Sequence, residues 1–118
     1  MFDAIKTIQG RHPSASIDVT GHSLGAALAT LAAIDIKKYF SFNKVTFYTF
    51  GSPRTGNKVF SDYVFSFFSD GAYNRVTHYD DMVVHVPPQF MSFVHTGNEV
   101  WYMKPDTDLT HKTCYNSL

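Results

Sequence analysis

The chain has one cysteine, Cys114, among its 118 residues, so no disulfide can form within it. Charged residues are also scarce, at 17% of the chain, compared with roughly 25% in an average soluble domain. Ten Lys and Arg residues balance ten Asp and Glu residues, and no basic run occurs. Because nucleic-acid binding needs a basic patch or stripe, this charge pattern argues against nucleic acid as a partner.

Long hydrophobic runs are missing as well. The longest candidate, 24–34, has eleven residues and is interrupted by Gly25 and Thr30. A membrane helix needs about 20 apolar residues, so the sequence predicts no transmembrane segment. The first residues show no charged-then-apolar signal segment, and the sequence leaves the compartment open.

Hydrophobic residues make up 44% of the chain, which is enough for a real core, and the length fits one domain over 1–118. The apolar periodicity and the turn-forming residues predict helices at 3–10, 24–40 and 59–68, strands at 16–21, 44–51 and 74–79, and a hairpin or two extended pieces at 93–96 and 99–103, followed by a loop from Lys104. Strands that alternate with helices indicate an α/β fold with a parallel sheet and flanking helices. Since three parallel strands make a small sheet, we expect self-association through an uncovered edge.

The segment Gly-His-Ser-Leu-Gly at 21–25 fits the pattern G-x-S-x-G between a predicted strand and a predicted helix. In a nucleophile elbow the serine stands at a sharp strand-to-helix turn, and the residues two before and two after it come too close for side chains. The pattern predicts Ser23 as a nucleophile and the N–H of Leu24 as an oxyanion donor. The alternative is a serine N-cap, with Gly21 and Gly25 allowing tight packing of helix on sheet.

Two adjacent aspartates, Asp80 and Asp81, follow the third predicted strand. In α/β-hydrolases the catalytic residues follow the chain order Ser, Asp or Glu, His, so the acid of such a triad is expected at this place. Aspartates after a strand are also common turn formers, and the alternative is that both serve only that purpose.

Four blocks of the sequence occur in an order known from one family. They are VTGHSLGAALATL (19–31), FYTFGSPRTGN (47–57), RVTHYDDMVVHVPP (75–88) and FVHTGNEVWY (93–102). Together they resemble the class 3 lipase family, the fungal-type triacylglycerol lipases with an α/β-hydrolase fold. The resemblance is strongest over 17–102. It implies a partial α/β-hydrolase with a nucleophile elbow, acting on lipid esters through an acyl-enzyme.

The resemblance also implies roles for single residues. The family register D-x-V-x-x-x-P-P falls on Asp81, Val83, Pro87 and Pro88. It implies that Asp81 is the acid that orients the catalytic histidine, while Asp80 is an exposed neighbour or a turn former. A lipid ester is the implied substrate, and the family leans toward secretion of the full-length protein.

The base is the missing member. The family's catalytic histidine lies in an Asp-His-x-x-Tyr-like segment, downstream of a Cys-x-Asn-Ser-like stretch that CYNSL at 114–118 resembles. None of the six histidines matches that position: His12, His22, His78, His85, His95 and His111. We therefore expect a truncated lipase domain whose histidine, earlier strands and lid helix lie outside these residues. Because a serine without a base is a poor nucleophile, the alternative is a catalytically incomplete fragment or pseudoenzyme.

Two other constellations carry weaker signals. His78, Asp80, Asp81 and His85 lie close in sequence but lack the spacing of a known metal motif, so we expect neither a metal nor a cofactor. Arg54, in the loop SPRTGN, could bind an anion. The loop has no P-loop lysine pattern, which favours a structural role joining strand to helix.

Overall fold

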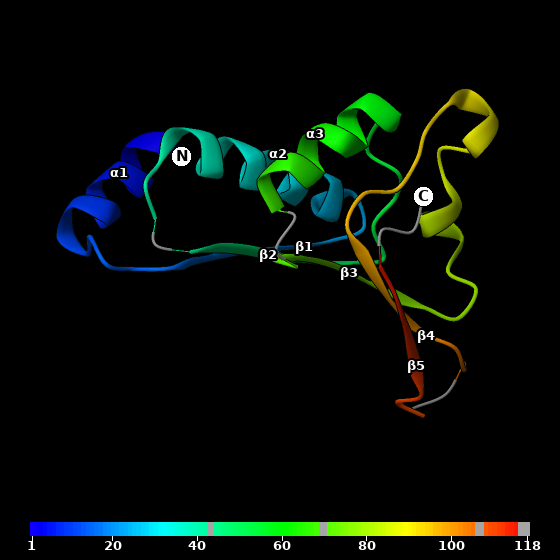
Figure 1. Cartoon of the computed structure of the whole chain (residues 1–118). Coiled ribbons are helices and arrows are strands. Elements are labelled where there is room, and N and C mark those ends of the chain that lie inside the picture. Colours follow the sequence, from blue (N-terminus) through cyan, green and yellow to red (C-terminus); the bar gives the residue numbers. More distant parts are fainter. Residues whose placement is uncertain (43, 69–70, 106–107, 116–118) are drawn as a thin grey trace.

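The computed structural model describes residues 1–42, 44–68, 71–105 and 108–115, which form one layer of helices on one sheet (Figure 1). In chain order the elements are α1 (Phe2–Arg11), β1 (Ile17–His22), α2 (Leu24–Tyr39), β2 (Val45–Phe50), α3 (Lys58–Phe68), β3 (Tyr73–His78), the 3₁₀ helices η1 (Met82–His85) and η2 (Gln89–Met91), β4 (Asn98–Tyr102) and β5 (His111–Cys114). The predicted α/β class is confirmed, and the helices and first three strands agree with the predicted ranges to within one or two residues.

The sheet has five strands in the order β1-β2-β3-β4-β5. The first four are parallel, and β5 is antiparallel to β4. Since parallel crossovers are right-handed, strands added in one direction place every connecting helix on the same face. Figure 1 shows α1, α2 and α3 on that face. The opposite face is open: Tyr48 and Phe50 of β2 are 44% and 43% exposed.

The C-terminal part of the sheet differs from the prediction. Of the two alternatives for 93–96 and 99–103, the hairpin is wrong and the two extended pieces are confirmed, because β4 pairs with β3 and Val94 forms only an isolated bridge with Gly56. The expected loop after Lys104 is wrong over His111–Cys114, which form β5. This strand is short and contains no fully buried residue, so it has the polar composition of an edge strand and resembles a loop in sequence.

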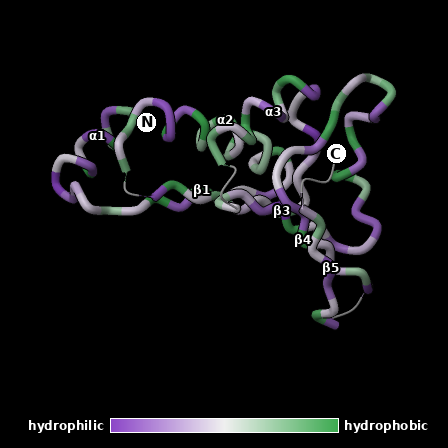
Figure 2. The backbone as a smooth tube through the Cα atoms, viewed as in Figure 1, coloured by the Kyte–Doolittle hydropathy of each residue, from purple (hydrophilic) through white to green (hydrophobic). Residues whose placement is uncertain are grey.

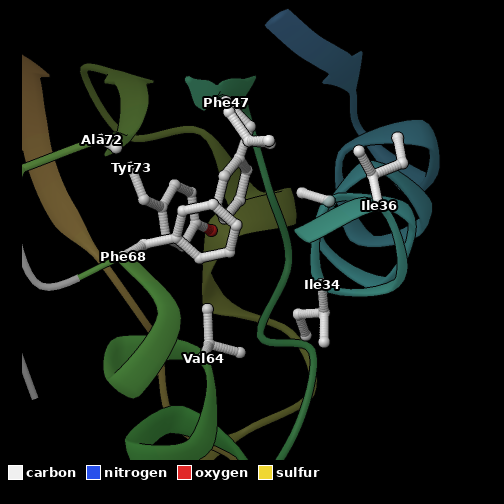
Figure 3. Packing of buried hydrophobic residues seen from close by; sticks show 9 residues of the cluster. Ile34, Ile36, Phe47, Val64, Phe68, Ala72 and Tyr73 are labelled. Atoms are coloured by element: carbon white, nitrogen blue, oxygen red, sulfur yellow. The ribbon is translucent and has the colours of Figure 1, made fainter. Parts of the chain in front are cut away.

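The core lies between the sheet and α2 and α3 (Figure 3). Phe47 of β2 is completely buried, stacks on Tyr73 with 3.6 Å between ring centroids, and meets Phe68 of α3 edge-on at 4.7 Å. Such pairs stabilise a core beyond the area that they bury. Of the apolar residues along α3, Val64 and Phe68 are buried in this core, whereas Val59 is 76% exposed.

Helix α2 packs on the sheet through small residues. Its buried residues are Ala26, Ala29, Thr30, Ala33, Ile34 and Ile36. The leucines of this helix lie on its outer side: Leu24, Leu28 and Leu31 are 70%, 59% and 46% exposed. Hydrophobic residues are accordingly distributed along the whole chain and not only in the layer between helices and sheet (Figure 2).

The closest approach of α2 to the sheet is at Gly21. A Cβ atom on Gly21 would lie 2.2 Å from the backbone oxygen of Gly25, a distance that no real Cβ contact has. A Cβ on Gly25 would meet nothing within 4 Å. The expectation that sterics require glycine at both positions is therefore wrong for Gly25.

Buried polar groups hold the segment before β4. Arg75 of β3 is 1% exposed, and its Nε donates to the Thr96 carbonyl at 2.9 Å. Burial lowers the pKa of Arg75, while the nearby Tyr73 and Glu99 oppose that shift. The Ser61 hydroxyl of α3 donates to the His95 carbonyl at 3.0 Å. The segment is thus tied to β3 on one side and to α3 on the other.

His95 is itself a partly buried side chain, and its Nε2 lies 2.8 Å from the Val84 carbonyl oxygen in η1. Burial, followed by the positive charge of Arg75, lowers the pKa of His95 from 6.5 to about 3. The ring is therefore neutral near pH 7. Since a carbonyl can only accept, the proton is on Nε2.

We predict opposite effects of alanine at the two glycines. Gly21→Ala forces α2 away from β1, so it should lower the free energy of unfolding by about 2 kcal/mol or more. Gly25→Ala meets no atom and improves helix propensity, so it should leave stability unchanged or raise it by up to ~1 kcal/mol. Urea unfolding of the two variants and the parent chain measures both values. A loss of equal size in both variants would contradict the one-sided contact.

We also predict that His95 makes the fold sensitive to mild acid. Below pH ~6.5 the unfolded chain binds a proton that folded His95 refuses, so stability falls as the pH is lowered. Between about pH 7 and 5 the loss from this group is roughly 2 kcal/mol. His95→Gln should remove that part of the loss in urea unfolding, whereas His12→Gln, at an exposed position, should keep it. An unchanged pH dependence in His95→Gln would show that the ring titrates normally.

Candidate active site

Ser23 is the single residue between β1 and α2, and its backbone is strained. Its dihedral angles are φ 56° and ψ −126°, a positive φ that residues other than glycine rarely adopt. Such strain costs about 1–3 kcal/mol and clusters at functional sites. Two backbone hydrogen bonds hold it: the Ser23 N–H donates to the Phe50 carbonyl at 3.0 Å, and the Ala26 N–H donates to the Ser23 carbonyl at 2.9 Å.

The Ser23 side chain does not cap the helix. Although Ser23 occupies the N-cap position of α2, its hydroxyl forms no capping hydrogen bond. The alternative of a plain serine N-cap therefore has no support in the geometry. The first-turn N–H groups of a helix have no intrahelical acceptor and carry the positive end of the dipole. The N–H of Leu24, the first residue of α2, is one of these groups and directly follows Ser23.

Asp81 follows the carboxyl end of β3, and the parallel strands bring it to the edge of the sheet at which Ser23 lies. Gly51 follows β2 with φ +56°, and its N–H donates to the Val76 carbonyl of β3. A Cβ on Gly51 would lie 2.8 Å from Oδ2 of Asp81 and 3.7 Å from Nε2 of His22. The carboxylate of Asp81 therefore rests against the Gly51 backbone, close to the residue that precedes Ser23.

The two aspartates differ in environment. Asp80 is exposed in the turn after β3, whereas Asp81 is half-buried and caps η1. Oδ1 of Asp81 accepts a hydrogen bond from the Val83 N–H at 2.9 Å. Among the described residues no donor bonds Oδ2, which is the oxygen beside Gly51. Oδ1 is thus held by a hydrogen bond, and Oδ2 can accept a hydrogen bond from another donor.

All six histidines lie in the described part of the chain, and none bonds to the Ser23 hydroxyl or the Asp81 carboxylate. Nε2 of His95 lies 2.8 Å from the Val84 carbonyl oxygen in η1, and Nδ1 of His111 lies 3.0 Å from the Leu109 carbonyl oxygen. His22 is exposed at the end of β1. Of the stretch CYNSL, Cys114 ends β5, while residues 116–118 lie outside the described residues.

The described ranges contain no group of three or more His, Cys, Asp or Glu side chains that could hold a metal ion. They also contain no helix with both the length and the apolar character needed to cross a membrane.

Sequence reasoning missed the contacts around Asp81 and the loop that follows it. Gly51 was visible only as the glycine that ends a predicted strand, and its contact with Asp81 depends on the pairing of β2 with β3. Arg54 was expected to join strand to helix. Its guanidinium instead donates to carbonyl oxygens of the loop that follows Asp81.

The chain matches known proteins in sequence and in structure. The family model described as Lipase (class 3) matches residues 1–91. A lipase of Rhizomucor miehei is 37% identical over 119 residues, covering 92% of this chain and 32% of that protein. The secreted mono- and diacylglycerol lipase 1 of Fusarium solani is 42% identical over 99 residues, covering 83% of this chain and 28% of that protein.

Solved structures agree with these matches. A triacylglycerol lipase whose catalytic centre is formed by a serine protease triad superposes with a TM-score of 0.86 at 35% identity, covering 98% of this chain and 44% of that one. The chain spans about a third of the length of the curated relatives that it matches. The family model covers most of this chain. The chain therefore belongs to the class 3 lipase family and has the α/β-hydrolase type of fold.

Proposed function

We propose that this chain carries the nucleophile and the acid of a serine hydrolase that acts on lipid esters. The observation that carries the proposal is the strained Ser23, which caps no helix N–H and stands at the sheet edge where Asp81 rests against Gly51. The names of the relatives, a triacylglycerol lipase and a mono- and diacylglycerol lipase, support acylglycerols as the substrate class.

In the proposed reaction Oγ of Ser23 attacks the ester carbonyl carbon while a histidine takes the hydroxyl proton. The N–H of Leu24 donates to the oxyanion of the tetrahedral intermediate. The intermediate expels the alcohol, which receives the proton from the histidine, and an acyl-enzyme remains. Water then attacks the acyl carbon and releases the fatty acid. Asp81 accepts a hydrogen bond from the histidine through Oδ2 and stabilises its imidazolium.

The base is proposed to come from outside these 118 residues. No imidazole within the described residues bonds to Ser23 or Asp81, and the relatives are about three times longer than the chain. The same observation favours a second candidate, in which the 118 residues alone keep the fold without catalysis. Self-association through the outer edge of β1, which pairs only with β2 among the described strands, stays a prediction.

Chemical rescue separates the two candidates. The chain alone should react with a fluorophosphonate probe near the background rate, because the hydroxyl lacks a base. Imidazole in solution should raise labelling of Ser23 at least about tenfold, below the 10²–10⁴ that a positioned base gives. Mass spectrometry of the labelled peptide measures both rates.

Three variants serve as controls for this experiment. Ser23→Ala should abolish the imidazole-dependent labelling. Asp81→Asn should weaken it, while the matched Asp80→Asn should leave it intact. Rapid labelling without imidazole would show that a histidine of this chain is the base. A folded chain that imidazole cannot rescue would favour the non-catalytic candidate.

A further inference from the structure

The loop that follows Asp81 is held by hydrogen bonds from other segments to its backbone carbonyls. Four consecutive carbonyl oxygens, those of residues 84–87, accept hydrogen bonds from outside the loop. The donors are Nε2 of His95 to Val84 (2.8 Å), Nη1 of Arg54 to His85 (2.5 Å), the backbone N–H of Arg54 to Val86 (2.8 Å) and Nη1 of Arg54 to Pro87 (2.9 Å). Three of the four bonds come from one residue, Arg54.

The loop has few other means of keeping its shape. Met82, Val86 and Phe90 are 82%, 50% and 87% exposed, and only Val84 of η1 is buried. Apolar side chains that face solvent contribute little packing energy. The conformation of the loop therefore depends on the hydrogen bonds to its carbonyls.

The position of η1 determines the position of the acid. The Val83 N–H in the first turn of η1 donates to Oδ1 of Asp81 and thereby orients the carboxylate. Because Asp81 directly precedes η1, this donor leaves Oδ1 when η1 loses its conformation. Arg54 lies three residues after Gly51, so one loop both leaves room for Oδ2 and holds the segment that carries Oδ1.

We propose that Arg54 is a positioning residue for the acid: its bonds to the carbonyls of His85, Val86 and Pro87 fix η1, and η1 fixes the carboxylate of Asp81. The catalytic meaning of this role rests on the proposed function. The geometry also answers the anion-binding alternative. Nη1 already donates to two carbonyls, and Nε is buried with no partner among the described residues. A guanidinium held in this way is directed at the loop.

The test reads the Asp81 carboxylate directly, by NMR of the ¹⁵N-labelled 118-residue chain. An amide that donates to a carboxylate changes its chemical shift when the carboxylate is protonated by acid. In the parent chain the Val83 amide should show this titration, and Asp81→Asn should abolish it. Arg54→Met should also abolish it, while the rest of the spectrum stays that of the folded chain. Arg11→Met, a matched change on exposed α1, should leave it unchanged.

The outcomes decide the role of Arg54. If Arg54→Met remains folded and Val83 titrates as in the parent chain, the proposal is wrong. If Arg54→Met does not fold, Arg54→Gln takes its place, since its amide nitrogen is two bonds short of the carbonyls. Arg54→Lys keeps the charge and most of the length, so it should restore part of the titration. A role in stability alone would lower the melting temperature without moving the Val83 signal.

A second readout separates this inference from the proposed function. In the imidazole-rescued labelling of Ser23, Arg54→Met should react at least about tenfold more slowly than Arg11→Met, as expected for a misplaced catalytic group. If Ser23 is not labelled in any variant, the proposed function fails. The Val83 titration still tests whether Arg54 positions the Asp81 carboxylate. If labelling of Ser23 requires Asp81 but the Val83 amide titrates normally in Arg54→Met, only the present inference fails.

Discussion

The contact between the backbone of Gly21 in β1 and that of Gly25 in α2 is the constraint on which the site depends. It lets the helix start with only one residue, Ser23, between it and the strand, and Ser23 makes this sharp turn with a positive φ. Any side chain at Gly21 would move α2 outward and lengthen the turn. The alanines on the buried side of α2 continue the same close approach along β1 and β2.

Parallel pairing then brings the other parts of the site to Ser23. Because β1, β2 and β3 run in the same direction and are adjacent, residues that follow each strand meet at one edge of the sheet. Gly51 and Asp81 come from segments far from Ser23 in sequence and still reach the same place. The open face below the sheet has no part in this arrangement, since strands added in one direction put every helix on one side.

The sequence predicted what local patterns encode and missed what depends on pairing. The alternation of strands and helices and the turn at Ser23 were within reach, since each rests on nearby residues. The choice of Asp81 over Asp80 as the acid came from the family register and stays a prediction. The hairpin alternative was wrong because β4 pairs with β3, which is distant in sequence, and so extends the parallel sheet. The strand β5 was missed because a polar edge strand has no pattern of apolar residues. In α2 the small residues form the side of the helix that packs on the sheet, and the leucines lie on its exposed side.

Side-chain packing and hydrogen bonding stabilise different parts of the fold. The aromatic cluster around Phe47 and Tyr73 supports the middle of the sheet, where side chains can be fully buried. The loop that follows Asp81 lies beyond that cluster, and its carbonyls accept hydrogen bonds from Arg54 and His95. Since the acceptors are backbone carbonyls, the loop's own side chains do not indicate where these donors are. In the proposed arrangement, the residues that position Asp81 lie in two other segments, the β2–α3 loop and the stretch before β4, which is why inspection of the sequence around Asp81 does not find them.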